Sequence, residues 1–308
     1  MSGASAAPGA ADVLPPDGRL RAPRRPLPRG TVDCHAHIFD RFERYPLAPG
    51  RKYSPPPCTR EAWMALHAAL GVDYGVQVHG SPYGFDNSIT EDFLREHRGR
   101  FAGVAAIPPQ VAEADLKRLD AAGFRAARLM DQYATGATTR DLEAIAARVA
   151  PYGWHIEINI ARSADWVELE PRLARCPVPL VFDHLGRVRS GEGLDAPGFR
   201  VIRRLLAARD DCWVKLSSWY RLSDAAAAKG AAARVADCED MKPFAQALLR
   251  ERPDRCVWGT NWPHPGLHAW MPNDADLVDQ LDGWLPSDAV RGPLFAANAA
   301  RLYRLPAR

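Results

Sequence analysis

Two histidines and an aspartate alternate along the first strand-like segment of the chain. Residues 31–39 read Thr-Val-Asp-Cys-His-Ala-His-Ile-Phe, which places Asp33, His35 and His37 at every second position. Because successive side chains of a strand face opposite sides, the pattern predicts that these three share one face. Two imidazoles at one place can bind a metal ion, transfer protons or polarise a carbonyl group. Imidazoles also find backbone partners readily, so the pair alone leaves a purely structural role open.

Polar side chains also end most of the other strand-like segments. In residues 154–160, three isoleucines alternate with His155, Glu157 and Asn159, which predicts that the isoleucines face helices and that Asn159 reaches the end of the strand. The same reasoning places further polar residues at strand ends: Gln77, His79, Arg128, His184, Lys215, Ser217 and the run 259–265. In a barrel of parallel strands, the carboxyl ends of all strands meet at one mouth, where active sites lie. We therefore expect a functional site at this mouth.

The spacing of the elements predicts a distorted (β/α)8 TIM barrel in a single domain. Eight strand-like runs alternate with helical stretches, the first helix having Thr59 as its N-cap and ending at Gly71. The strands are expected at 31–39, 74–78, 101–107, 124–129, 154–160, 179–182, 212–217 and 255–258. A doubly wound open sheet is the alternative, but the first strand is not followed by a glycine-rich phosphate-binding turn. We predict the barrel over residues 31–308, after a Pro/Arg-rich arm at 1–30 that lies on the barrel or is disordered.

Composition limits the classes of partner. The 40 basic and 37 acidic residues leave a net charge of +3, which does not favour a nucleic acid or a membrane. The chain shows no apolar run typical of a signal peptide or a membrane span. Its six cysteines are scattered without a CxxC pair, as is typical of a reduced, cytoplasmic protein. A small anion needs only local positive charge and remains open, and so does a homo-oligomer.

Three motifs in one order carry a resemblance to a known family. They are residues 32–39, the run Phe-Asp-His-Leu-Gly-Arg at 182–187, and Trp-Gly-Thr-Asn-Trp-Pro-His-Pro at 258–265. With these motifs the chain resembles the amidohydrolase superfamily, and within it the 2-pyrone-4,6-dicarboxylate hydrolase-like branch of lactonases, over residues 31 to about 304. The resemblance implies a hydrolase that opens a small carboxylated or sulfonated lactone by water attack on the ring carbonyl, in aromatic-compound catabolism.

The resemblance also implies roles for particular residues. His35, His37 and His184 would polarise the carbonyl group, and Asn261 stands where the family has the catalytic base. Arg128 and Arg221, which suit a planar carboxylate or sulfonate, would bind the substrate, and Tyr53 would help to close the site. From their places at strand ends and in the loops that follow, we also expect substrate contacts from His79, Ser81, Asn159 and His264. Each arginine has an ion pair with a neighbouring acid as its alternative role. We further expect Asp183 to orient a neighbouring imidazole or to cap a turn, and His67 to lie on the surface of the first helix.

The residue at 261 departs from the family pattern, which has aspartate there. An amide does not accept a proton as a carboxylate does, and loss of a positioned base typically costs about 10²–10⁴ in rate. Three explanations stay open: a substitution made to hold the substrate uncleaved, a natural variant with another base such as His184 or His79, or a silent binding protein on the same barrel. Among enzymes, the rival is a metal-dependent decarboxylase of an aromatic acid.

The same motifs bear on metal binding. A catalytic zinc usually has three protein ligands, and the metal-dependent members that this chain resembles add a histidine after strand five. Here that position is Asn159, so only His35 and His37 remain, with Glu157 or His184 as recruits. We therefore predict that no cofactor is required, with a weakly held zinc ion as the alternative.

Overall fold

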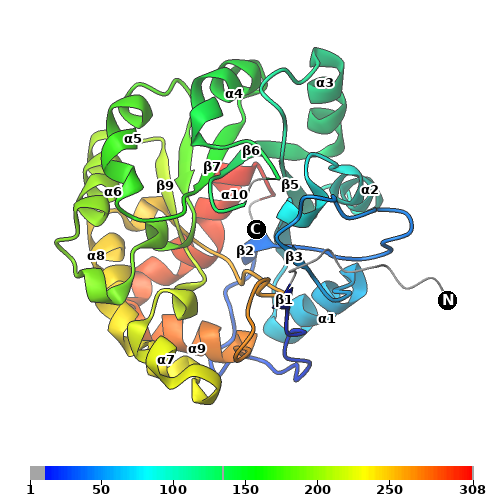
Figure 1. Cartoon of the computed structure of the whole chain (residues 1–308). Coiled ribbons are helices and arrows are strands. Elements are labelled where there is room, and N and C mark those ends of the chain that lie inside the picture. Colours follow the sequence, from blue (N-terminus) through cyan, green and yellow to red (C-terminus); the bar gives the residue numbers. More distant parts are fainter. Residues whose placement is uncertain (1–10, 134, 307–308) are drawn as a thin grey trace.

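Eight parallel strands form a sheet at the centre of a ring of helices (Figure 1) in the computed structural model, which describes residues 11–133 and 135–306. The sheet order is β10-β9-β8-β7-β6-β5-β4-β2, so that neighbours in sequence are neighbours in space. The strands of the sheet are β2 (Val32–Ala36), β4 (Tyr74–Val78), β5 (Phe101–Ala105), β6 (Phe124–Met130), β7 (His155–Asn159), β8 (Leu180–Phe182), β9 (Cys212–Leu216) and β10 (Cys256–Trp258). The predicted TIM barrel is confirmed.

Helices follow the strands and cover the outside of the barrel. They are α1 (Arg60–Leu70), α2 (Ser88–Glu96), α3 (Glu113–Ala122), α4 (Leu142–Val149), α5 (Asp165–Ala174), α6 (Pro197–Ala208), α7 (Asp224–Lys229), α8 (Lys242–Glu251), α9 (Asp274–Trp284) and α10 (Asn298–Tyr303). The predicted ends of α1 are confirmed, because the Thr59 side chain accepts a hydrogen bond from the amide of Ala62 and Gly71 adopts a left-handed conformation with φ of 81°. None of the helices within residues 11–133 and 135–306 is both long and apolar enough to cross a membrane.

The segment after β10 completes the ring of strands. The amide of Asn261 donates to the His35 carbonyl at 2.7 Å, and the amide of His37 donates to the Trp262 carbonyl at 2.8 Å. The barrel is thus closed by irregular backbone between β10 and β2, which makes it distorted. Because this backbone carries Asn261, the fold holds that side chain next to the histidines of β2.

The predicted common face of Asp33, His35 and His37 is wrong for Asp33. The pairing of β2 with β4 shifts register between Asp33 and Ala36, which is a β-bulge. Cys34 therefore packs inside the barrel, while the Asp33 carboxylate faces α1 and accepts from the indole of Trp63 at 3.3 Å. The extra residue in the bulge explains why His35 still points inward although Cys34 does so too.

His67 is buried, which corrects its predicted surface position. Its side chain is 0% exposed on α1, and its Nε2 lies 3.2 Å from a carboxylate oxygen of Asp33. Asp33 also accepts from the amide of Thr260 at 2.8 Å and from its hydroxyl at 2.7 Å. This cluster attaches β2 both to α1 and to the loop after β10, so it is a structural support for the mouth.

The alternation in β7 is as predicted, whereas that in β4 is reversed. Ile156, Ile158 and Ile160 lie in the outer core between sheet and helices. In β4, however, Val76 and Val78 pack in the inner cluster. Added Cβ atoms at Gly75 would meet His67 and Trp63 of α1, so Gln77, on the same side as Gly75, faces the helices instead of the interior.

The described part of the arm runs along the mouth side of α9. The amide of Leu14 donates to the carbonyl of Leu267 at 2.9 Å, and Arg21 pairs with Asp279 at 3.0 Å. Two short strands, β1 (Ala11–Asp12) and β3 (Tyr53–Ser54), pair in parallel beside the barrel. Residues 1–10 of the predicted arm lie outside the described residues, and the domain boundary at residue 30 stays a prediction.

Candidate active site

One open-mouthed pocket of about 390 Å³ lies at the carboxyl ends of the strands. Its wall combines eight of the residues that the sequence singled out with five others. The eight are His37, Tyr53, Ser81, Arg128, Asn159, His184, Arg221 and Asn261, and the others are Met130, Gln132, Tyr133, Arg187 and Pro265. Side chains from nearly the whole ring of strands therefore meet at one small cavity.

The pocket carries an excess of positive charge from three arginines. Arg128 donates to the His79 carbonyl at 3.0 Å and lies 3.5 Å from a carboxylate oxygen of Asp183. Arg187 and Arg221 form no salt bridge with an acidic side chain among the described residues. Burial, and then the nearby Arg221, lower the pKa of Arg187. Only Arg128 lies beside a carboxylate in the described part of the chain, so the three guanidinium groups leave binding capacity for an anionic ligand, and their paired N–H donors match carboxylate or sulfonate geometry.

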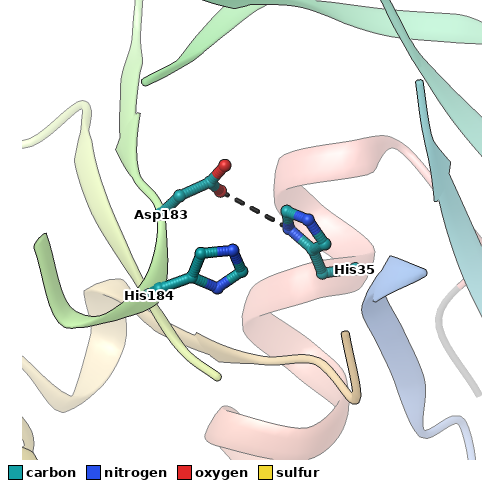
Figure 2. Close-up of side chains that lie close together, drawn as sticks. All are labelled: His35, Asp183 and His184. Atoms are coloured by element: carbon teal, nitrogen blue, oxygen red, sulfur yellow. Dashed lines mark ion pairs between the residues drawn. The ribbon is translucent and has the colours of Figure 1, made fainter. Parts of the chain in front are cut away.

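His35, Asp183 and His184 lie together against the pocket, with the two rings tilted at 4.6 Å between centroids (Figure 2). His35 Nδ1 lies 3.5 Å from Asp183 Oδ1, but the two atoms form no hydrogen bond, so the role of Asp183 in orienting an imidazole stays a prediction. The His35 ring also meets His37 edge-on at 5.0 Å. His35 itself is fully buried and supports the two rings that line the pocket.

A buried lysine fixes the proton position on His35. Lys215 Nζ lies 3.1 Å from His35 Nδ1, 3.3 Å from Asp183 and 2.5 Å from Glu157. Because an ammonium group only donates, Nδ1 of His35 accepts and the ring proton lies on Nε2. This Nε2 has no hydrogen-bond partner among the described residues, so it is a donor that remains available.

The histidines of this cluster are uncharged near neutral pH. Burial, reinforced by Lys215, lowers the pKa of His35 well below its ordinary value, and burial with the neighbouring His35 does the same for His184. Burial and then Arg128 lower the pKa of His37 to about 3. The Nδ1 of neutral His37 donates to the Val78 carbonyl at 2.8 Å, which leaves Nε2 as an acceptor toward the pocket.

The donor set does not fit a divalent metal ion well. Within the described residues, the cluster that could hold an ion consists of His35, Asp183 and His184, and it does not include His37. Lys215 already occupies both His35 Nδ1 and Asp183, and Arg128 lies beside the same carboxylate. Two fixed cations would repel an added ion, and His35 offers it no free lone pair. Glu157, predicted as a recruit, is instead bound by Lys215 and by the Tyr303 hydroxyl, each at 2.5 Å.

Asn261 holds its amide group in a defined orientation in the pocket wall. Its Nδ2 donates to the hydroxyl of Tyr220 at 2.9 Å and to that of Ser218 at 3.2 Å. Its backbone has φ of 61°, a left-handed conformation that asparagine tolerates better than most residues. The nitrogen of the amide is therefore directed at Tyr220, a residue that the sequence did not single out.

Two of the predicted substrate contacts lie outside the pocket wall. His79 follows β4 on its outer side, and its Nε2 lies 2.7 Å from the Gly84 carbonyl. His264 is buried behind Asn261, with Nδ1 2.7 Å from the Tyr220 hydroxyl and Nε2 3.2 Å from Asp274. The sequence predicted His264 as a substrate contact, whereas the structure places it outside the pocket wall with its ring against Tyr220.

Sequence reasoning missed several residues of the site. Arg187 ends the motif at 182–187 and could have been found there, since a cation after a strand end is a typical anion ligand. Tyr133 lies in a loop without any pattern, and it contacts Tyr53 with ring centroids 5.6 Å apart. Tyr220 and Asp274 carried no local signal, because their partners are distant in sequence.

The barrel carries histidines and arginines at its carboxyl end, and a model of the amidohydrolase family matches residues 32–305. The chain belongs to the amidohydrolase family. It is 33% identical to 2-pyrone-4,6-dicarboxylate hydrolase of Comamonas testosteroni, covering 91% of this chain and 92% of that protein. It is 32% identical to 4-sulfomuconolactone hydrolase of Hydrogenophaga intermedia, covering 94% of each. A crystal structure from Agrobacterium tumefaciens superposes with a TM-score of 0.82 at 28% identity, covering 93% of this chain and all of that one.

Proposed function

We propose that this protein hydrolyses a small lactone that carries carboxylate or sulfonate groups, by attack of water on the ring carbonyl. The observation that carries the proposal is the pocket itself, where uncharged imidazoles and three arginines face one open-mouthed pocket. Relatives of similar length are named for the hydrolysis of a pyrone dicarboxylate and of a sulfonated muconolactone. Both substrates are small cyclic esters with acidic groups, which the charge of this pocket suits.

The proposed roles follow from the hydrogen bonds of each residue. Arg128, Arg187 and Arg221 bind the acidic substituents, and Tyr53 and Ser81 line the same wall. His184, supported by His35, donates toward the carbonyl oxygen and stabilises the negative charge that develops there. His37, whose Nε2 is an acceptor, holds the attacking water. Neutral imidazoles suit this task, because they donate hydrogen bonds without transferring a proton to the ester.

The ring-opening test uses the native protein and Asn261→Asp on a panel of pyrone dicarboxylates, muconolactones and sugar lactones. Ring opening by either form, followed by ultraviolet absorbance and by proton release, supports the proposal. If neither form opens any ring, the lactonase hypothesis is wrong. Release of carbon dioxide selects the decarboxylase instead, and tight binding without turnover selects the binding protein.

We propose that the reaction needs no metal ion. The support is the position of Lys215, whose ammonium group donates to His35 and pairs with Asp183, two of the three residues that could hold an ion. Turnover should persist after treatment with a chelator, at unchanged kcat. A tightly held ion at one per chain that is required for turnover would contradict this.

The proposal also covers the cellular compartment and the oligomeric state of the protein. All six cysteines are buried and free, which supports the predicted reduced, cytoplasmic compartment. A homo-oligomer stays a prediction, which analytical ultracentrifugation would test.

A further inference from the structure

The described part of the arm connects two loops that carry residues of the pocket wall. Strand β1 (Ala11–Asp12) pairs in parallel with β3 (Tyr53–Ser54), which lies in the loop after β2 and includes Tyr53 of the pocket wall (Figure 1). Shortly after β1, the amide of Leu14 donates to the carbonyl of Leu267 at 2.9 Å. Leu267 lies in the loop after β10, close to Pro265 of the pocket wall. One short stretch of backbone is therefore bonded to both loops.

The next part of the arm is fixed to the start of α9. The side-chain nitrogen of Asn273 donates to the Arg19 carbonyl at 2.9 Å, and the amide of Arg24 donates to a carboxylate oxygen of Asp279 at 2.6 Å. Residues 15–16, both proline, lie between this attached part and the stretch that bonds the loops. Proline rings restrict the backbone, so the attachment to α9 limits how far the stretch can move.

The pocket residues of the two loops also contact a third loop. Tyr53 is 6% exposed, and its ring meets that of Tyr133 with the centroids 5.6 Å apart. Tyr133 belongs to the loop after β6, and its hydroxyl lies 3.6 Å from the position that a Cβ of Gly266 would take. Gly266 stands between Pro265 and Leu267 in the loop after β10. The outer wall of the pocket is thus made of loops that contact one another, and the arm joins two of them.

The imidazoles of the pocket are held from within the barrel instead. Nδ1 of His37 donates to the Val78 carbonyl of β4 at 2.8 Å. Nδ1 of His184 lies 2.8 Å from the hydroxyl of Ser217, which follows β9. Neither bond involves the arm. A change in the arm should therefore alter the outer wall of the pocket and leave the imidazoles in place.

We propose that residues 11–14 are positioning residues of the active site, which hold the loops of Tyr53 and Pro265 in the arrangement that binds the substrate. This inference rests on the proposed lactone hydrolysis. Without these backbone bonds the two loops adopt other arrangements as well, and the apparent affinity falls in proportion to the fraction of molecules with a complete wall. Since the imidazoles do not move, the loss should appear in KM and not in kcat.

The first test removes the Leu14 bond in the full-length chain. Leu14→Pro deletes the N–H donor, and the backbone at this position already favours extended conformations because Pro15 follows it. With a lactone that the native protein opens, we expect KM to rise by about two- to tenfold, the usual effect of one lost hydrogen bond, with kcat unchanged. An unchanged KM overturns the inference, and so does a fall of kcat without a rise of KM, which would assign the bond a purely structural role.

Leu20→Pro is the matched control within the same arm. The N–H of Leu20 has no hydrogen-bond partner among the described residues, and its side chain is 48% exposed. KM should therefore keep its native value in this variant. An equal rise of KM in Leu14→Pro and Leu20→Pro would contradict the inference, because it would show that any proline in the arm has this effect.

A triple variant with proline at Ala11, Asp12 and Leu14 extends the test to the pairing of β1 with β3. Proline cannot donate to a strand ladder, so the variant removes these N–H donors while the chain keeps its full length. We expect KM to rise by about tenfold or more, with kcat again unchanged. A KM no higher than that of Leu14→Pro would show that β1 does not position Tyr53, which overturns the inference for residues 11–12.

Hydrogen exchange distinguishes this inference from the proposed function, because it needs no turnover. The backbone amides of residues 51–54 and 266–270 should exchange faster in the triple variant than in Leu20→Pro. The triple variant should also bind 2-pyrone-4,6-dicarboxylate more weakly in calorimetry, by the same factor as the rise of KM. If no lactone is opened but exchange is faster and binding is weaker, the proposed hydrolysis fails and the role of the arm stands. Equal exchange or equal affinity in the two variants overturns the inference even if lactones are hydrolysed.

Discussion

The histidines at the mouth of the barrel fall into two groups with opposite charge. His35, His37 and His184, on β2 and after β8, have lowered pKa values and are neutral. His264, after β10, has a pKa raised to about 9 and is protonated at neutral pH. All four are buried, and burial alone lowers the pKa of every one of them. The difference therefore comes from neighbours: Lys215 and Arg128 on one side, Tyr220 and Asp274 on the other.

This contrast assigns chemistry to each side of the pocket. Groups whose surroundings separate their pKa values mark the donor and the acceptor of protons in a site. The neutral histidines, His35, His37 and His184, can stabilise a negatively charged oxygen by hydrogen bonds. The protonated His264 holds a proton. The first and the last of the following experiments each remove one cause of the contrast, and the second tests the effect of burial on another neutral histidine, His79.

The largest effect is expected from Lys215→Met. The change leaves the buried carboxylates of Glu157 and Asp183 without their shared cation, and breaking a buried pair in this way typically costs about 3–5 kcal/mol of unfolding free energy. Urea denaturation measures it. Lys229→Met is the matched control, since Lys229 pairs with Asp237 at 2.5 Å but its side chain is 54% exposed, so at most about 1 kcal/mol should be lost. Equal losses in the two variants would show that burial does not increase the contribution of the Lys215 ion pairs to stability.

The next largest effect is expected on the pH dependence of the unfolding free energy, through His79. His79, also buried, has its pKa lowered from 6.5 to about 4 by burial, despite its bond to the Gly84 carbonyl. The unfolded chain therefore binds a proton that the folded chain does not, and stability falls as the pH decreases from about 6.5 toward 4. The contribution of one such group is about 3 kcal/mol. In His79→Gln the fall of unfolding free energy between pH 6.5 and 4 should be smaller by that order, and an unchanged fall would contradict it.

The sequence predicted the features that depend on neighbours along the chain. The barrel follows from alternating segments, and the ends of α1 follow from Thr59 and Gly71. The outward isoleucines of β7 were also correct, because that strand is regular. The same parity rule failed in β2, where a bulge turns Asp33 outward, since a bulge is set by pairing with another strand.

The sequence predicted those residues of the site that can be recognised from their own position along the chain. His184 and Arg128 were found because they lie at the carboxyl ends of strands, and Arg221 was found through the family resemblance. Tyr220 and Asp274 are ordinary residues in their own segments, and their role arises because the fold brings residues 220, 261, 264 and 274 together. Lys215 was seen at a strand end, but its effect on His35 depends on a contact across the barrel.

The smallest effect is expected from a change beside His264, the protonated histidine of the contrast. Asp274→Asn removes one of the two groups that raise the pKa of His264, and loss of an opposite charge at this distance typically lowers a pKa by about one to two pH units. NMR titration of the His264 ring should therefore show a midpoint well below 9. Because the folded pKa of native His264 exceeds that of the unfolded chain, its stabilisation is complete below about pH 6.5 and disappears as the pH rises through about 9. In Asp274→Asn this alkaline loss should begin at lower pH, whereas Asp276→Asn, on the same helix but paired with Arg21, should leave it unchanged. A midpoint that stays near 9 would mean that Asp274 does not contribute to the raised pKa of His264.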